Sequence, residues 1–398
     1  MSLMLRRAAA SAVLALLFLT LFASAAAGGA REGQPIALGA FIGDSYRYPS
    51  LYDQWADDVG RRPVVLNSYK AWTIPLIDEP QLQEMWERGA VPIVTWEPWD
   101  ESGAPVFPLR EIAAGAFDPY IRRSARAAAA WGRPLFLRFA HEMNGGWYPW
   151  GRGHGDTAKQ YRESWHHIVR IFEAEGAGNV RWIWCPNENS TGRFAFQPYY
   201  PGDDFVDWIG IDGFNWELSP RWQSFDEIFA STYNSLLAMT DKPMMIVETG
   251  SWEHGGDKAA WVRDALEEEI PRYSHIRAFL WWSVDDSRGD LRVDSSPAAL
   301  RAARTGLASP YYGATREELL ATPSRLEQAT PVPVPGAGEP SASKLRRGLK
   351  DNSIWLAIGA LAISVGALLL VVLKRHRGLA IASVQPPSEE GQPQDARL

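Results

Sequence analysis

The sequence predicts an α/β fold, specifically a closed (β/α)8 TIM barrel, from three observations. Between residue 34 and about residue 310, short apolar runs rich in β-forming residues alternate with longer amphipathic segments. There are eight such runs within about 280 residues, close to the ~250 residues typical of the barrel. The runs are almost continuously apolar, as strands covered on both faces are. A doubly wound open sheet is the alternative, but no glycine-rich phosphate turn follows the first run.

Each apolar run is expected to form one strand. In chain order the expected strands are Ile36–Phe41, Val64–Tyr69, Val91–Trp96, Leu135–His141, Val180–Cys185, Trp208–Phe214, Met244–Glu248 and Ile276–Ser283. Four of the intervening segments have clear helical spacing and length, namely Pro119–Trp131, Thr157–Glu175, Phe225–Met239 and Lys258–Ile270. We expect these segments to pack outside the strands.

The two ends of the chain have patterns that differ from the barrel. The N-terminus combines two arginines, an apolar run and small residues, which is the order of a secretory signal. Ile354 to Leu373 has no charged residue and is long enough to cross a hydrocarbon core of ~30 Å as a helix. The predicted organisation is a signal peptide at 1–27, the barrel at 32–321, a proline-rich and basic linker at 322–353, a transmembrane helix at 354–373 and a disordered cytoplasmic tail at 374–398. The barrel is therefore expected outside the cell membrane, held by a single pass.

Charge and cysteine content exclude several classes of protein. Residues 32–321 contain 28 basic and 41 acidic side chains, a formal charge of 28 − 41 = −13, so a nucleic-acid partner is not expected. A single cysteine, Cys185, allows neither an intrachain disulfide nor a multi-cysteine metal site. No cofactor is indicated, although a structural calcium on the acidic rim stays open, and we expect a monomer. The 19 tryptophans are numerous for 398 residues, and flat aromatic faces stack on sugars as well as filling cores.

Two glutamates occupy the positions where such barrels carry their active sites, the C-terminal ends of the strands. Glu142 follows the fourth expected strand, and Glu248 ends the seventh. Retaining hydrolysis of a glycosidic bond needs two carboxyl groups roughly 5 to 5.5 Å apart, one as acid and base and one as nucleophile. The pair therefore predicts a glycoside hydrolase. A salt bridge on the rim is the structural alternative for either glutamate alone.

The segments around these glutamates resemble glycoside hydrolase family 26. The family's acid/base segment is similar to His141–Gly151, HEMNGGWYPWG, and its nucleophile segment is similar to Ile246–Gly250, IVETG. The resemblance extends over most of residues 36–310. It implies a retaining endo-β-glycanase in which Glu142 is the proton donor and Glu248 the nucleophile.

The resemblance leaves the substrate open between β-1,4-mannan and mixed-linkage β-1,3-1,4-glucan. Met143-Asn144 after the acid is closer to the glucanase-like members than to the Asn-Thr pattern common in mannanases. The expected partner is thus a β-linked polysaccharide or oligosaccharide, and the enzyme an endo-β-mannanase or endo-β-glucanase.

Residues near the glutamates are expected to bind substrate. Arg138 precedes Glu142 by four positions on the same strand and should point into the barrel mouth, where a cation would stabilise carboxylates. His141 matches a histidine that the family uses near the donor, with a satisfied core histidine as the alternative. Asn144 and seven aromatic residues complete the predicted set, the aromatics being Trp147, Tyr148, Trp150, Trp96, Trp99, Trp216 and Trp282. About half of these aromatic residues are expected to touch glycan.

One position departs from the family pattern. Many members have a tyrosine at the end of strand six that hydrogen-bonds the nucleophile, whereas the matching residue here is Phe214. Either the nucleophile lacks that hydroxyl here, or Tyr148 or another group supplies it. The rival function is a catalytically weak, membrane-anchored glycan-binding protein, which only Phe214 favours.

Two other motifs carry no mechanism. Gly43-Asp44-Ser45 is similar to a lipase nucleophile block but lacks a late Asp-x-x-His. His141-Glu142 begins a zinc-protease pattern, but Gly145 stands where the second histidine would be.

Overall fold

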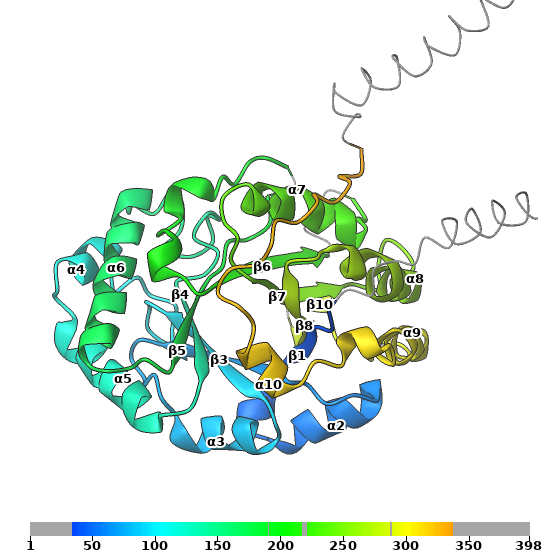
Figure 1. The fold of residues 1–398 in the computed structure, drawn as a ribbon, viewed down its shortest axis with the longest axis horizontal. Coiled ribbons are helices and arrows are strands. Elements are labelled where there is room, and N and C mark those ends of the chain that lie inside the picture. Colours follow the sequence, from blue (N-terminus) through cyan, green and yellow to red (C-terminus); the bar gives the residue numbers. More distant parts are fainter. Residues whose placement is uncertain (1–33, 190, 217–220, 287–288, 337–398) are drawn as a thin grey trace, which may run out of the picture. The chain divides into compact units, whose positions relative to one another are not determined.

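The computed structural model describes residues 34–336, except residues 190, 217–220 and 287–288. Eight parallel strands form a closed barrel in chain order (Figure 1). They are β1 (Ala37–Ile42), β2 (Val65–Ala71), β3 (Val91–Glu97), β4 (Leu135–Phe139), β5 (Val180–Trp184), β6 (Trp208–Asn215), β7 (Met244–Ser251) and β8 (Ile276–Ser283). The predicted (β/α)8 barrel is confirmed, and no strand end differs from its predicted position by more than three residues.

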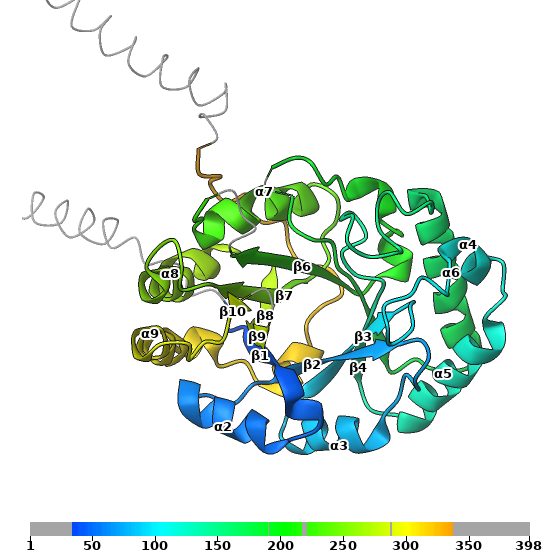
Figure 2. The same cartoon turned by 180° about the vertical axis from the view of Figure 1, so that it is seen from behind.

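Helices surround the barrel, as Figures 1 and 2 show from opposite sides. They are α2 (Ser50–Val59), α3 (Glu79–Glu87), α4 (Leu109–Ala113), α5 (Asp118–Trp131), α6 (Ala158–Ala174), α7 (Phe225–Leu237), α8 (Lys258–Asp264) and α9 (Pro297–Leu307). Short 3-10 turns occur at η1 (Gly43–Tyr46), η2 (Gln197–Tyr199), η3 (Asp203–Phe205) and η6 (Pro310–Tyr312).

Two of the long helices, α6 and α7, begin at a side chain that caps them. Thr157 before α6 and Ser224 before α7 each accept a backbone N–H from the first turn, and each is part of a capping box. The single helix expected over Lys258–Ile270 is instead α8 followed by a π-helical turn, η4 (Ala265–Glu269), and a 3-10 turn, η5 (Ile270–Arg272). Pro271 lacks the N–H that would continue regular α-helical bonding.

Side chains along each strand alternate between the barrel interior and the layer under the helices. On β3, Ile93 belongs to the interior cluster, whereas Val94 and Trp96 belong to the outer one. Thr95 and Glu97 therefore face inward, and Glu97, the last residue of β3, lies at the mouth.

A bulge changes this alternation on β7. Ile211 of β6 pairs with Ile246 of β7, but the next residue, Asp212, pairs with Glu248. The extra residue, Val247, packs in the interior cluster. Bulges redirect the side chains that follow them, and this one brings Glu248 level with Asp212.

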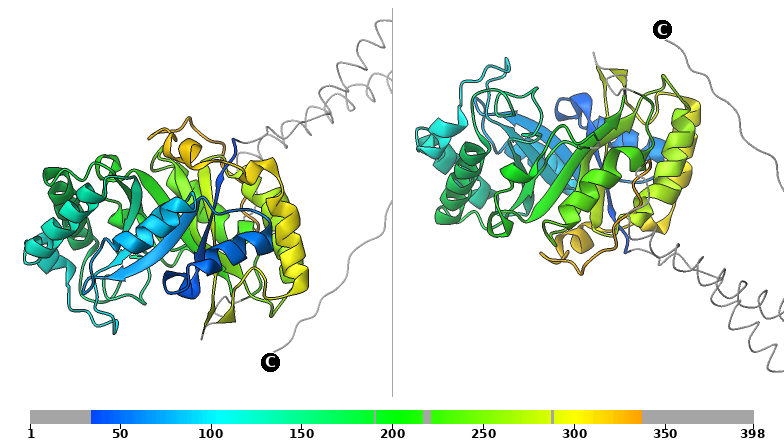
Figure 3. Two further views of the ribbon diagram at one scale, coloured as in Figure 1. Left: turned by 90° about the horizontal axis from the view of Figure 1, so that it is seen from below. Right: turned by 90° about the horizontal axis from the view of Figure 1, so that it is seen from above.

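The two ends of the barrel differ. The short helix α10 (Arg316–Leu320) lies at the end where the strands begin, with Leu319 packed on the interior cluster. The hairpin of β9 (Asp285–Asp286) and β10 (Gly289–Asp290) follows β8 at the other end (Figure 3). Loops after β3, β4 and β5 extend from that second end, which is where the predicted site residues lie.

The predicted boundary at residue 321 is too early. Part of the expected linker is docked on the barrel: Asn234 accepts the N–H of Val332 at 2.9 Å and donates to its carbonyl at 2.8 Å. Val332 is itself buried in the outer cluster. The signal peptide at 1–27, the remaining linker, the transmembrane helix at 354–373 and the tail at 374–398 lie outside the described residues. Within the described ones, no helix has the length and apolar character needed to span a membrane.

Arg61, which lies just before β2, joins the start of the barrel to the end of α9 and the segment that follows it. Its Nε donates to the carbonyl of Leu307 at 2.6 Å, and its other nitrogens donate to Ser309 and Tyr312, both at 3.1 Å. One of these carbonyls belongs to the last residue of α9, and the other two lie in the segment after it. The neighbouring Arg62 instead makes one exposed ion pair with Asp53 at 2.8 Å.

Arg61→Ala is therefore expected to lower the free energy of unfolding by about 2 kcal/mol, because several hydrogen bonds from a charged group are lost together. Arg62→Ala is the matched control and should cost less than ~1 kcal/mol, as exposed ion pairs do. Urea unfolding followed by tryptophan fluorescence measures both. Equal losses would show that the hydrogen bonds of Arg61 stabilise the fold no more than the exposed ion pair of Arg62 does.

Candidate active site

Glu142 and Glu248 both lie at the barrel mouth and are almost fully buried, with 6% and 5% of their surface exposed. Glu142 is in the loop after β4, and Glu248 is on β7. The negative charge of Glu248 acts on Glu142, so the two carboxyl groups share one electrostatic environment. Their hydrogen-bond partners are nevertheless entirely different.

Glu248 is held by a cation and a hydroxyl. The Nη2 of Arg138 and the hydroxyl of Tyr69 both donate to its Oε1. Arg138 also donates from Nη1 to Asp212 at 2.7 Å and from Nε to Thr95 at 2.9 Å. The prediction that Arg138 points toward the carboxylates is confirmed. Its predicted role as a sugar contact is wrong, because its side chain is fully buried beneath them.

Of the two alternatives, a substitute hydroxyl is present, and it comes from Tyr69 on β2 rather than from Tyr148. Tyr148 instead places its hydroxyl 3.1 Å from Nε2 of His141. Phe214, at the position of the family's tyrosine, stacks on Trp216 with ring centroids 4.9 Å apart. The alternation of β2 accounts for Tyr69, because Val65 is interior and every second residue after it faces inward.

Glu142 is held by neutral donors. The indole Nε1 of Trp147 donates to its Oε2 at 2.5 Å, and the amide of Asn187 donates to its Oε1 at 2.6 Å. Burial, reinforced by the charge of Glu248, raises the pKa of Glu142 to about 7, although both hydrogen bonds oppose that rise. A carboxyl with this pKa remains substantially protonated near neutral pH, as a general acid must.

The backbone on either side of His141 is strained. Ala140 and Glu142 have φ values of 43° and 52°, in the left-handed region that residues with a Cβ seldom adopt. The N–H of Ala140 donates to Trp96 at 3.1 Å, and that of Glu142 donates to Cys185 at 2.8 Å, which fixes this path. The predicted strand to His141 therefore ends at Phe139. Such conformations concentrate at functional sites.

The loop after β4 folds back so that Trp147 reaches Glu142. A Cβ at Gly145 would lie 2.3 Å from Cζ2 of Trp147, so only glycine permits this approach. The indole is 48% exposed even though its N–H is bonded to the carboxyl. One surface of Trp147 is therefore available to a ligand beside the acid.

Two predicted polar contacts are buried within the protein. Asn144 donates to the carbonyls of Asn187 and Phe194 at 2.9 and 2.8 Å, so its predicted sugar contact is wrong and it anchors the loop that carries Asn187. His141 is also fully buried. Burial and the charge of Arg138 lower the pKa of His141 well below its usual value, so the ring is neutral.

The predicted aromatic platforms separate by exposure. The prediction that Trp96 binds substrate is wrong. Its side chain points to the outer layer and stacks on Trp72, with ring centroids 4.7 Å apart. Trp150 is buried and stacks on Tyr148 at 4.6 Å. Trp282 is buried in a small cluster with Phe214 and Leu291. The remaining four keep exposed surface, namely Trp99, Trp147, Tyr148 and Trp216.

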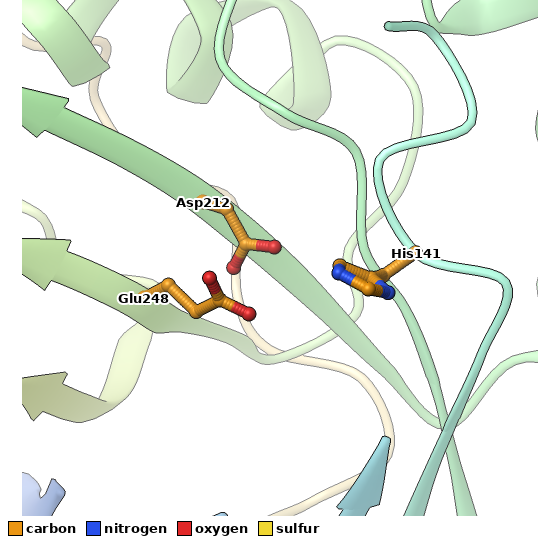
Figure 4. Close-up of side chains that lie close together, drawn as sticks. All are labelled: His141, Asp212 and Glu248. Atoms are coloured by element: carbon orange, nitrogen blue, oxygen red, sulfur yellow. The ribbon is translucent and has the colours of Figure 1, made fainter. Parts of the chain in front are cut away.

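His141, Asp212 and Glu248 point toward a common space (Figure 4), and one nitrogen or oxygen atom of each lies within 4.8 Å of the others. These are atoms that ligate divalent cations. However, Arg138 already donates to both carboxyl groups, and its positive charge would oppose a second cation. The cluster is therefore explained as two carboxyl groups around one guanidinium.

Curated relatives and a family description match the chain. Glycosyl hydrolase family 26 matches residues 123–265, which include both glutamates. Endoglucanase H of Acetivibrio thermocellus is 33% identical over 281 residues, covering 68% of this chain and 30% of that protein. A mannan endo-1,4-beta-mannosidase of Bacillus subtilis is 29% identical over 160 residues, covering 38% of this chain and 39% of that protein. The chain thus spans only about a third of the length of these relatives.

Solved structures share the barrel. The endo-beta-1,4-mannanase of Cellulomonas fimi gives a TM-score of 0.55 at 19% identity, over 76% of each chain. The endo-beta-mannanase/endo-beta-glucanase of Prevotella bryantii gives 0.55 at 16% identity, over 72% of this chain and 45% of that one. At such identities the likeness supports the fold alone. Because the family description spans both glutamates and Endoglucanase H matches over two thirds of this sequence, the chain belongs to glycoside hydrolase family 26.

Proposed function

We propose that this chain is a retaining endo-β-glycanase that hydrolyses a β-linked polysaccharide by double displacement. One observation carries the proposal: two buried carboxyl groups, one in the loop after β4 and one on β7, have opposite environments. Glu142, with its pKa near 7, suits a proton donor. Glu248, bonded to Arg138 and Tyr69, suits a nucleophile held in one orientation.

The proposed reaction has two steps. Glu142 first donates its proton to the glycosidic oxygen while Glu248 attacks the anomeric carbon, which breaks the sugar's bond to the leaving group and forms a glycosyl ester. Glu142, now a carboxylate, then takes a proton from water, and the resulting oxygen nucleophile displaces Glu248. Two inversions give overall retention, and both carboxyl groups return to their initial states.

The proposed substrates are mixed-linkage β-1,3-1,4-glucan and β-1,4-mannan. Endoglucanase H matches more of the chain than the mannan endo-1,4-beta-mannosidase does, which favours testing β-glucan first. The rival proposal, a weak glycan-binding protein, depended on Phe214. Tyr69 removes that support, because Glu248 has a tyrosine hydroxyl as its partner.

We also propose that the enzyme acts at the outer face of the cell membrane. The support is the signal-like pattern at 1–27 and the uncharged stretch at 354–373. In this arrangement the barrel is extracellular and residues 374–398 are cytoplasmic.

Replacing either glutamate should abolish turnover while leaving the fold intact. Glu248→Ala and Glu142→Ala, made in residues 32–336, are expected to lose at least ~10³-fold in kcat, because a nucleophile and a proton donor are removed. Reducing-sugar release on β-glucan, mannan, glucomannan, β-1,3-xylan and cellulose measures this. On an aryl β-glycoside, whose leaving group departs without a proton donor, azide should rescue Glu248→Ala with an α-glycosyl azide product and Glu142→Ala with a β-glycosyl azide product. Retained turnover in both variants would contradict the assignment of the two glutamates, whereas a wild type that binds these polymers without releasing sugar would support the binding-protein alternative.

Activity should fall as pH rises through about 7, because Glu142 then loses the proton it must donate. The Asn187 amide lowers the pKa of Glu142, so Asn187→Ala should move this decline in kcat/KM to higher pH. Asn189→Ala is the matched control, since Asn189 bonds the N–H of Phe194 rather than Glu142, and its decline should stay in place. A shift of the Asn187 variant to lower pH would contradict the assignment of Glu142 as the acid.

Tyr69→Phe should lower kcat by about 10- to 100-fold, because a hydrogen bond to a charged group is lost from the nucleophile. Tyr148→Phe removes the hydroxyl that contacts His141 and should change kcat less than about fivefold. Both variants keep their rings, so steady-state kinetics on one polymer compares the two hydroxyls directly. A larger loss for Tyr148→Phe would show that catalysis depends on the hydroxyl of Tyr148 more than on that of Tyr69.

A further inference from the structure

Glu97 is a third buried carboxyl group at the barrel mouth, and the proposed mechanism does not use it. Its residue is 7% exposed, and it ends β3 on the inward-facing side. Among the described residues its carboxyl accepts one hydrogen bond, from Nε1 of Trp99 to Oε2 at 3.2 Å. That bond leaves Oε1 without a protein donor in the described part of the chain.

Strand register places Glu97 beside the reacting groups. It pairs with Ala71 of β2, two residues after Tyr69. On its other side, Trp96 pairs with Phe139, so Glu97 lies level with Ala140, two residues before Glu142. The charges of Arg138, Glu248 and Glu142 all act on Glu97, and its own charge acts on Tyr148.

A purely structural role accounts poorly for this residue. Buried carboxyl groups in proteins are normally paired with a cation or bonded by several donors, and in the described chain Glu97 takes part in no direct ion pair. Burial raises its pKa to about 8, so near neutral pH it is mostly uncharged and can donate as well as accept a hydrogen bond. A group of this kind suits a sugar hydroxyl, which also donates and accepts.

We propose that Glu97 binds a hydroxyl group of the sugar ring whose glycosidic bond is cleaved, and so helps to determine which sugar is accepted. This inference rests on the proposed function. A site built to hydrogen-bond a hydroxyl rejects a ligand that lacks it, because the buried polar group is left unpaired. Glu97 is thus a specificity-determining residue, distinct from the acid and the nucleophile.

The test pairs deletions in the protein with deletions in the substrate. Wild type, Glu97→Ala and Glu97→Gln are made in the full chain. Each is assayed for kcat/KM on aryl β-disaccharide glycosides of the active sugar, either complete or lacking one hydroxyl of the reacting ring. Glu97→Gln keeps an acceptor for Trp99 and guards against loss of folding, which thermal unfolding monitors. Glu269→Gln is the matched control, because this half-buried carboxyl also has a raised pKa but accepts the N–H of Phe225, the first residue of α7.

On the complete substrate, Glu97→Ala is expected to lose about 10- to 100-fold in kcat/KM, because its hydrogen bond to the sugar hydroxyl is removed. One deoxy substrate should lose as much with wild type, yet show no further loss with Glu97→Ala. Glu269→Gln should give the wild-type ratios throughout. If every deoxy substrate loses the same factor in Glu97→Ala as in wild type, Glu97 binds no hydroxyl and the inference is overturned. A wild type inactive on all the polymers would instead overturn the proposed function.

Discussion

The buried guanidinium of Arg138 is the interaction on which the barrel mouth depends. From β4 it reaches side chains of β2, β3, β6 and β7, so one residue links five strands. Two of its partners, Asp212 and Glu248, are carboxyl groups buried with it. Burying such charges is tolerable only when their hydrogen bonding is nearly complete. The hydroxyl oxygens of Thr95 and Tyr69 accept further hydrogen bonds from the guanidinium of Arg138. Glu248 consequently has little freedom to move.

The difference between the two glutamates follows from topology rather than from residue type. The bulge on β7 turns Glu248 toward Asp212 and hence onto Arg138. Glu142 leaves its strand through a left-handed turn and meets only an indole and an amide from loops. The same side chain thus lies beside a cation in one place and beside neutral donors in the other. The proposed acid and the proposed nucleophile are therefore distinguished before any substrate binds.

Sequence could predict the strands and the two glutamates because both follow from local pattern: apolar runs, and polar residues where those runs end. Trp96 was misassigned because it ends a predicted strand, whereas alternation from Ile93 directs it outward. Tyr69 also ends a predicted strand, but it was missed because no carboxylate follows it closely, as carboxylates follow the ends of other predicted strands. Asn187 and Asn144 could not be assigned from sequence, since their roles depend on how two loops from different strands meet.

The left-handed backbone at Ala140 and Glu142 also bears on how this protein could be engineered for heat tolerance. Glycine would adopt that conformation without strain at position 140, and neutral side chains would relieve the crowding of buried carboxyl groups. Screens that select on melting temperature alone would therefore recover substitutions inside the proposed catalytic centre. Such substitutions would raise thermal stability and lower the turnover rate. A library meant to preserve turnover should leave the residues just after β4 unchanged and vary the outer helices instead.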